Sequence, residues 1–78
     1  MIRVERLKKP QIGGDPVPDG YWETSFPTIE GAEAAIEEQI AGYHHHGFDS
    51  KHGYWWARNL GEVDIDIFVV RPNPGHSA

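Results

Sequence analysis

Cysteine is absent from this chain of 78 residues. Without thiols, the sequence excludes a disulfide scaffold, a thiolate metal site and a cysteine nucleophile. A short chain that has no disulfides is typical of a reducing compartment. The sequence therefore predicts a cytoplasmic protein.

Long apolar segments are also missing. A membrane-spanning helix needs roughly 20 consecutive apolar residues, and the longest apolar runs here are far shorter. From Met1 to Lys9 the chain alternates charged and apolar residues, which is not the pattern of a signal peptide. We expect neither a membrane segment nor a secretory leader.

Basic residues are few. Seven Lys and Arg stand against twelve Asp and Glu, which gives a formal net charge of −5. Affinity for nucleic acid comes largely from neutralising phosphates, so this charge disfavours nucleic acid as a partner. The basic residues are unevenly spread, because Arg3, Arg6, Lys8 and Lys9 all lie in the first nine positions.

The length is sufficient for one domain. We expect a single compact domain over residues 1–71, with a long loop at 8–20 that is rich in glycine and proline. Residues 72–78 contain two prolines and end in small polar residues, which predicts a flexible tail. A core this small supplies only about 3–5 kcal/mol, so packing against a second copy would stabilise the fold.

The hydrophobic pattern predicts four strands and one helix. Strands are expected at 2–7, 21–26, 53–59 and 63–71, with a turn at 59–62. Thr28 is a good N-cap for a helix, and one apolar stripe follows at helical spacing: Ile29, Ala32, Ile36, Ile40 and Tyr43. Gly42 or Gly47 would end this helix, and Gly47 is preferred because Phe48 follows it.

The element order β-β-α-β-β predicts an α+β fold, in which one helix packs on one face of a small four-stranded, mainly antiparallel sheet. A single helix covers only one face. Trp55 and Trp56 are neighbours on a strand and must point opposite ways, and the last strand is apolar on both faces after Asp66. We therefore expect an apolar surface away from the helix.

Such a surface indicates an interface. The leading hypothesis is a protein-interaction module without enzymatic activity that forms a homodimer, or binds another protein, through an aromatic face of the sheet. The residues expected to anchor the contact are Trp55, Trp56, Phe68 and Val70.

Histidines gather in one segment. Imidazole and carboxylate are the usual ligands of zinc when thiolate is absent, so His44, His46, Asp49 and His52 form an alternative site for a metal or a small ligand. Consecutive residues on a helix are turned about 100° from one another and cannot face one point. The preferred interpretation is a set of polar residues at a helix end, without metal or cofactor.

The strand Tyr54–Arg58 carries aromatic rings and a cation. Rings on a sheet stack on unpaired bases, so Trp55, Trp56 and Arg58 form an alternative single-stranded nucleic-acid site. The two acids of the next strand, Asp64 and Asp66, are expected to repel phosphate there. As paired carboxylates they could serve catalysis, but alternating acids usually keep an exposed strand soluble, and we expect no enzymatic activity.

Overall fold

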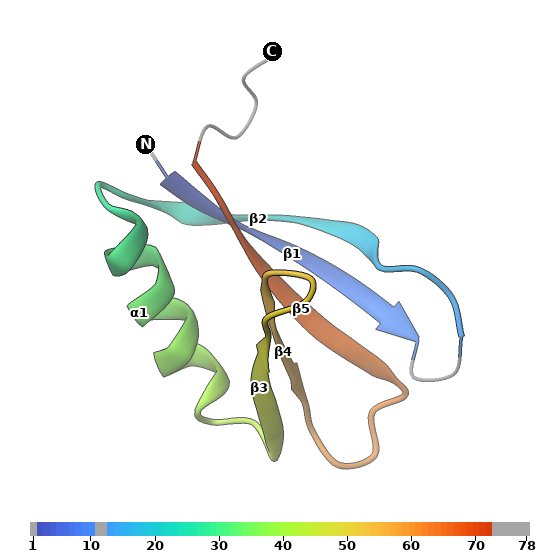
Figure 1. Cartoon of the computed structure of the whole chain (residues 1–78). Helices are drawn as coiled ribbons and strands as arrows, with labels where there is room; N and C mark the ends of the chain where they lie inside the picture. The colour runs from blue at the N-terminus through green and yellow to red at the C-terminus, as the bar shows by residue number, and fades with distance from the viewer. Residues whose placement is uncertain (1, 11–12, 73–78) are drawn as a thin grey trace.

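The computed structural model describes residues 2–10 and 13–72. It contains one helix and five strands, which form a single antiparallel sheet of order β2-β1-β5-β4-β3 (Figure 1). The elements in chain order are β1 (Ile2–Pro10), β2 (Val17–Phe26), α1 (Ile29–Ile40), β3 (His45–Asp49), β4 (Tyr54–Arg58) and β5 (Asp64–Arg71). The predicted α+β class with one helix on one face is confirmed, but the predicted number of strands is wrong.

The strand missed by the sequence is β3. Its residues were expected to belong to the end of the helix, with Gly47 as the cap, but α1 ends at Ile40 with Ala41 as its C-cap. Residues His45–Asp49 pair instead with β4 in a regular antiparallel hairpin. Histidine and glycine are poor helix formers, so the hydrogen bonds and packing of the hairpin outweigh the helical stripe in this segment.

The start of α1 was predicted correctly. Thr28 adopts the extended backbone of an N-cap, and its Oγ1 accepts a hydrogen bond from the Gly31 amide at 3.0 Å. Glu30 lies in the first turn, where the positive end of the helix dipole favours an acid. Ala32, Ile36 and Ile40 of the expected stripe are buried, so the stripe is the face that α1 turns to the sheet.

The loop between the first two strands is shorter than predicted. Lys8–Pro10 belong to β1 and Val17–Gly20 to β2, so both strands extend into the segment 8–20. The pairing is irregular. Between the pair Ile2–Phe26 and the pair Lys8–Val17, β1 covers six residue steps whereas β2 covers nine. Bulges of this kind are typical of sheet edges. Of the predicted tail, residues 73–78 lie outside the described residues.

The hydrophobic core lies between α1 and the sheet. It joins the apolar face of the helix to side chains from three strands: Val4, Ala32, Ile36, Ile40, Trp55, Ala57 and Phe68. The indole of Trp22 closes one side of this core, with its ring centroid 5.7 Å from that of Phe68. α1 has 12 residues, and no helix in the described part of the chain is long and apolar enough to cross a membrane.

The surface of the sheet turned away from α1 is called the open face here. Alternation along β5 places Ile65, Ile67 and Val69 on this face and Asp66, Phe68 and Val70 under the helix. Ile67 is only 1% exposed although it lies outside the core beneath α1. The open face therefore holds apolar packing of its own.

Candidate interaction surface

Trp56 is the largest side chain on the open face. Its indole lies across the neighbouring strand β3 at Gly47, the residue that pairs with it. A Cβ atom added to Gly47 would stand 3.1 Å from Trp56 Cζ2 and Nε1, closer than ordinary van der Waals contact. Gly47 is thus the residue that allows the indole to lie flat on the sheet, where an aromatic ring covers a glycine in an outer strand.

Beside Trp56 the open face is hollowed. The hollow encloses about 280 Å³. Its lining is mainly apolar, with Trp56 and Tyr54 from β4 and Ile65 and Ile67 from β5, and Lys9 and Asp49 complete it. We call this site the apolar hollow.

The part of the open face beyond the hollow carries polar contacts. Arg71 Nε donates a hydrogen bond to Glu5 Oε1 at 2.8 Å, between β5 and β1. Arg3 donates from Nε and Nη2 to the Trp22 carbonyl, at 3.1 and 2.6 Å, and its guanidinium carbon lies 5.4 Å from the centre of the Tyr21 ring. The contacts of Arg3 hold the bulged strand β2 to β1, and the contact of Arg71 with Glu5 joins β5 to β1.

The four predicted anchor residues do not share one surface. Trp55 and Phe68 are 7% and 3% exposed in the core under α1, and Val70 packs against that core. Only Trp56 of the four lies on the open face. Alternation along the strands indicated two faces, but it did not tell which face the helix would cover. The apolar partners of Trp56 on this face are Ile65 and Ile67.

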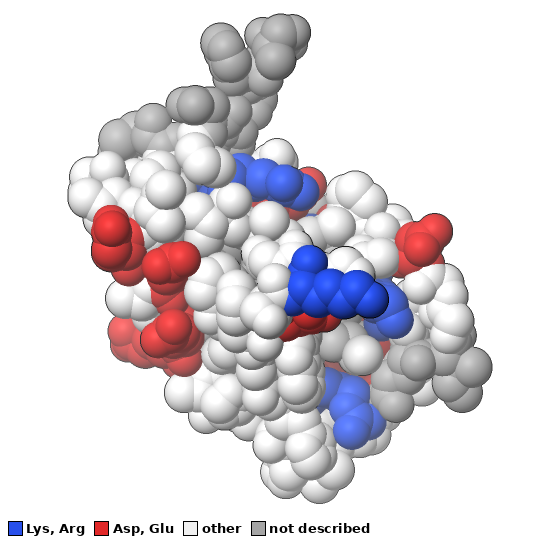
Figure 2. Space-filling model, in the orientation of Figure 1, with Lys and Arg blue, Asp and Glu red and all other residues white. Residues whose placement is uncertain are grey.

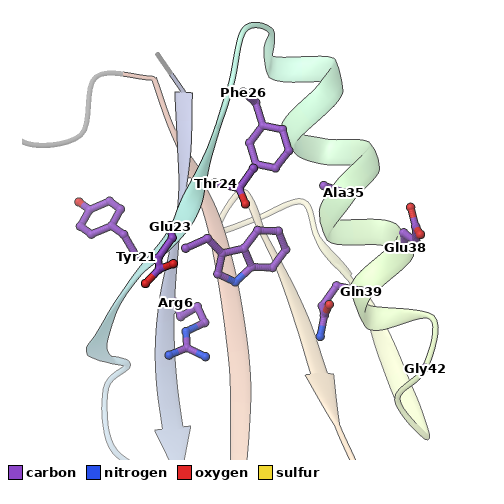
Figure 3. Close-up of a pocket in the computed structure, with 10 residues that line it drawn as sticks. Arg6, Tyr21, Glu23, Thr24, Phe26, Ala35, Glu38, Gln39 and Gly42 are labelled. Carbon is purple, nitrogen blue, oxygen red and sulfur yellow. The ribbon is translucent and has the colours of Figure 1, made fainter.

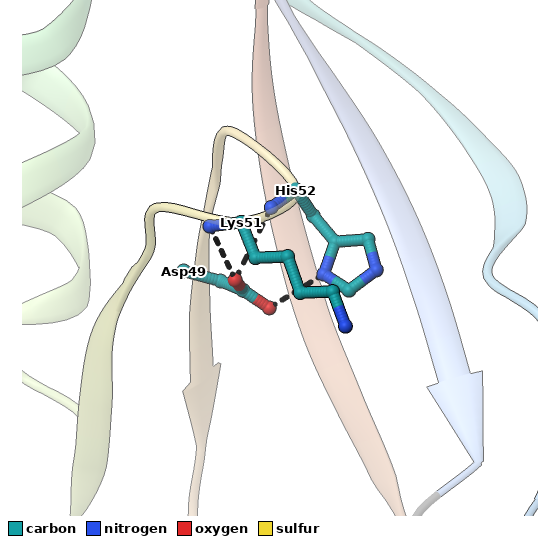
Figure 4. A network of polar contacts seen from close by, with 3 residues as sticks. All are labelled: Asp49, Lys51 and His52. Carbon is teal, nitrogen blue, oxygen red and sulfur yellow. Dashed lines mark hydrogen bonds and ion pairs between the residues drawn. The ribbon is translucent and has the colours of Figure 1, made fainter.

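The predicted metal or ligand residues are only partly brought together. Asp49 and His52 meet in the loop between β3 and β4, where His52 Nδ1 lies 2.8 Å from Asp49 Oδ2 (Figure 4). His44 precedes β3, and its amide donates to Asn59 Oδ1. His46 lies within β3 beside α1, where it lines a pocket with Ile40 and Phe48. Among the described residues no group of three or more His, Asp or Glu is placed to hold a metal ion.

The Asp49 carboxylate organises the hairpin loop. Its Oδ1 accepts hydrogen bonds from the amides of Lys51 and His52, at 3.0 and 3.2 Å. The side-chain hydrogen bond with His52 is the main cause that holds the pKa of Asp49 below the usual aspartate value, and desolvation opposes it. The network makes the turn between β3 and β4, which explains why this acid and this histidine meet.

A groove on the other side of the sheet was not predicted. It encloses about 890 Å³ between α1 and β2. Figure 3 shows Arg6 and Gln39 on opposite sides of this space, with Phe26 at one end. No sequence signal could have found it, because its walls come from strands and a helix that only the tertiary structure brings together. Acids and bases line it and the smaller pocket beside it: Arg6, Lys8, Asp19, Glu23, Glu38 and Asp66.

Tyr43 joins the end of α1 to the sheet beside this groove. Its hydroxyl donates to Asp66 Oδ2 at 3.0 Å. Desolvation, followed by the hydrogen bond to Asp66 and the charges of Asp66 and Glu62, raises the pKa of Tyr43 to about 12, and Arg6 opposes this rise. Asp66 is thus engaged on the helix-covered side of the sheet and contributes no charge to the open face.

Comparison with known proteins provides no relative for this chain. No protein-family model matches it, and neither a curated protein nor a solved structure does. What the chain does is therefore inferred from its own residues and their geometry.

Proposed function

We propose that the chain is a small interaction module that forms a homodimer by packing the open faces of two copies together. The observation that carries this proposal is the apolar hollow, where Trp56 and Ile65 remain partly exposed beside the buried Ile67. Apolar surface on the uncovered side of a sheet is typical of an interface, and a large aromatic side chain at its centre is typical of a binding hot spot.

The charges around the hollow suit a second copy of the same chain. Lys9 and Asp49 come from different strands, β1 and β3, which are separated in the sheet by β5 and β4. In a dimer with two-fold symmetry each surface contacts its own duplicate. A two-fold axis that lies in the contact plane and crosses the line from Lys9 to Asp49 at right angles would set Lys9 of each copy near Asp49 of the other. In that arrangement the polar rim is complementary to itself.

The acidic residues of the chain favour the same arrangement. Figure 2 shows acidic side chains gathered over α1, whose sequence contributes Glu30, Glu33, Glu37 and Glu38. α1 lies on the side of the sheet opposite the open face. Packing the two open faces together would leave both helices on the outside, with two sheets between them, so the repulsion between two copies of charge −5 is reduced.

The open shape of the hollow favours a protein over a small ligand. Sites for small molecules usually enclose about 300–1,000 Å³ and bury most of the ligand. The hollow encloses about 280 Å³ and opens on the surface of the sheet. Side chains from a second sheet would fill it as they fill the space between the layers of a β-sandwich.

The test is the substitution Ile65→Glu. Its position opposite Lys9 on β1 gives the new carboxylate a partner within the chain, so the fold should persist. In the dimer the same change would bury a like-charged group from each copy. We expect native mass spectrometry and sedimentation equilibrium to show fewer copies in the assembly of this variant than in that of the wild type.

The matched control is Ile29→Glu. It makes the same chemical change at a residue that is 43% exposed in the first turn of α1, away from the open face. We expect this variant to assemble as the wild type does. A folded Ile65→Glu variant that assembles as the wild type does, or a wild type that is monomeric at all concentrations, would refute the proposal.

A second candidate function uses the same face. Trp56 and Arg58 are two residues apart on β4, so both side chains point to the open face. Arg3, Lys9 and Arg71 lie on the same face. Aromatic rings with cations are the usual elements of a site for single-stranded nucleic acid. The sequence pattern had placed the repulsive charge of Asp66 beside the aromatic strand. Asp66 lies instead on the helix-covered side of the sheet, where it accepts a hydrogen bond from Tyr43, and this position favours the candidate. The net charge of the chain disfavours it, and we rank it second.

A further inference from the structure

The outer strand β3 leaves one edge of the sheet unpaired. Within the described residues β3 has a single strand neighbour, β4 (Figure 1). The backbone N–H and C=O groups on its other side are therefore available to another strand. Exposed edges of this kind are sites where further chains add to a sheet, and natural proteins usually block them.

The opposite edge of the sheet is blocked in the usual ways. β2 contains Pro18, which has no backbone N–H, and it carries three more residues than the stretch of β1 that it pairs with. Bulges and prolines prevent regular pairing with another strand. β3 has none of these features. Its five residues contain no proline or lysine, and their register with β4 is unbroken.

The sequence of β3 is complementary to itself. An antiparallel pair of two β3 strands centred on Gly47 sets His45 opposite Asp49, His46 opposite Phe48 and Gly47 opposite its own copy. The Asp49 carboxylate accepts three hydrogen bonds in its own loop, and a carboxylate has about four acceptor positions. It can accept another from an imidazole, so His45 and Asp49 form a matched polar pair on the open face.

The other side chains suit the same register. Phe48 is 50% exposed although its ring lies 4.6 Å from that of Trp55. Pairing would bring His46 of a second copy beside it, and ring pairs across strands stabilise a sheet. At the centre Gly47 presents no side chain, and Trp56 covers it within its own chain.

We propose that β3 is a second homotypic contact, through which two copies join edge to edge into a continuous ten-stranded antiparallel sheet. This contact is separate from the packing of open faces. Its two-fold axis is perpendicular to the sheet, whereas the axis of the face contact lies parallel to the sheet. The two axes would generate a closed tetramer of D2 symmetry where they intersect at right angles, and an open assembly otherwise.

The deciding variant is His45→Asp. Within the chain His45 is opposite Arg58 on β4, so the new carboxylate gains a basic partner and the hairpin should persist. In the edge contact, the new carboxylate of each copy would face Asp49 of the other copy. Like charges across an interface strongly disfavour association, and we expect the dissociation constant of the edge contact to rise about tenfold or more.

His44→Asp is the matched control. It also replaces an imidazole with a carboxylate, but one residue earlier, before β3 begins. This change should leave assembly unchanged. Native mass spectrometry and sedimentation equilibrium are measured for the wild type, His44→Asp, His45→Asp, Ile65→Glu and the double variant His45→Asp/Ile65→Glu, and circular dichroism confirms that each is folded.

The expected pattern is a wild-type assembly of more than two copies, a dimer for each of the single variants His45→Asp and Ile65→Glu, and a monomer for the double variant. A wild-type dimer that His45→Asp converts to monomer while Ile65→Glu does not would support the edge contact and refute the face contact. If Ile65→Glu alone changes assembly, or if His44→Asp has the same effect as His45→Asp, the edge contact is refuted. A wild type that is always monomeric refutes both.

Discussion

Gly47 and Trp56 show how one residue decides the shape of a surface. The indole needs the space that a side chain at Gly47 would occupy, since a Cβ atom there would stand 3.1 Å from the ring. With glycine in β3 the ring lies flat, covers β3 and helps to line the apolar hollow. The surface proposed as the dimer interface therefore depends on the absence of a methyl group.

Replacing Gly47 with alanine should lower the free energy of unfolding by about 1–2 kcal/mol, because an extra methyl in a packed site forces the neighbouring side chains to move. Urea unfolding followed by tryptophan fluorescence measures this. The control is Gly42→Ala, where the nearest atom to the new Cβ is the Gln39 carbonyl oxygen at an ordinary 3.9 Å. That variant should be neutral or slightly more stable, and equal stabilities would contradict the contact between Trp56 and Gly47.

At the scale of elements, the chain after α1 is fastened to the middle of the sheet. Tyr43 N donates to the Ile40 carbonyl at 2.9 Å, and the Tyr43 hydroxyl donates to Asp66 on β5. The turn that leads from α1 into β3 thus has an anchor in a strand 23 residues away. This anchor lies between the end of the helix at Ile40 and the start of the following strand.

Tyr43→Phe should lower stability at neutral pH by about 1–2 kcal/mol, because a hydrogen bond to a charged group is lost and Asp66 keeps its desolvation. The raised pKa adds an alkaline signature. Since the folded chain holds the Tyr43 proton more tightly than the unfolded chain, this stabilisation is present below pH 10 and is lost as the pH rises toward about 12.

Phenolate absorbance measures that titration. The wild type should show a component near pH 12 that Tyr43→Phe removes. Asp66→Asn retains an acceptor without the charge, and it should lower the pKa of Tyr43 toward the usual tyrosine value. If the component near pH 12 remains in Tyr43→Phe, another tyrosine produces it and the assignment is wrong.

At the scale of the whole molecule, charge and apolar surface are separated. The acids of α1 lie on one side of the sheet, and the apolar hollow with several basic residues lies on the other. The two candidate functions of the open face respond oppositely to salt. Two copies of an acidic chain repel one another, whereas a nucleic acid is attracted to the basic residues around Trp56.

Raising the ionic strength from about 0.01 M to about 1 M shortens the Debye length from about 30 Å to about 3 Å. The dissociation constant of the face dimer, measured by sedimentation equilibrium on His45→Asp to isolate that contact, should therefore fall several-fold. Binding of a fluorescent single-stranded oligonucleotide would weaken instead, with a logarithmic slope of about −0.7 for each phosphate neutralised. A dimer that weakens with salt would indicate instead that the Lys9–Asp49 pairs at the rim outweigh the repulsion between like-charged copies.

The amino-acid sequence by itself determined the local elements whose signals are strong. Thr28 marked the start of the helix, the stripe of Ala32, Ile36 and Ile40 marked its buried face, and alternation marked β5 with its two faces. These features follow from backbone geometry and from the period of the side chains, which neighbours along the chain fix without distant contacts. The α+β class followed from the order of these elements.

Only the tertiary structure decided the rest. Whether His45–Asp49 continue a helix or form a strand depends on pairing with β4, which local propensity does not contain. Which tryptophan is buried depends on the side of the sheet that α1 covers, and both sides are apolar along β5. The open face and the free edge of β3 exist because one helix covers one face and five strands leave two edges. The contacts that set them join residues far apart in the chain.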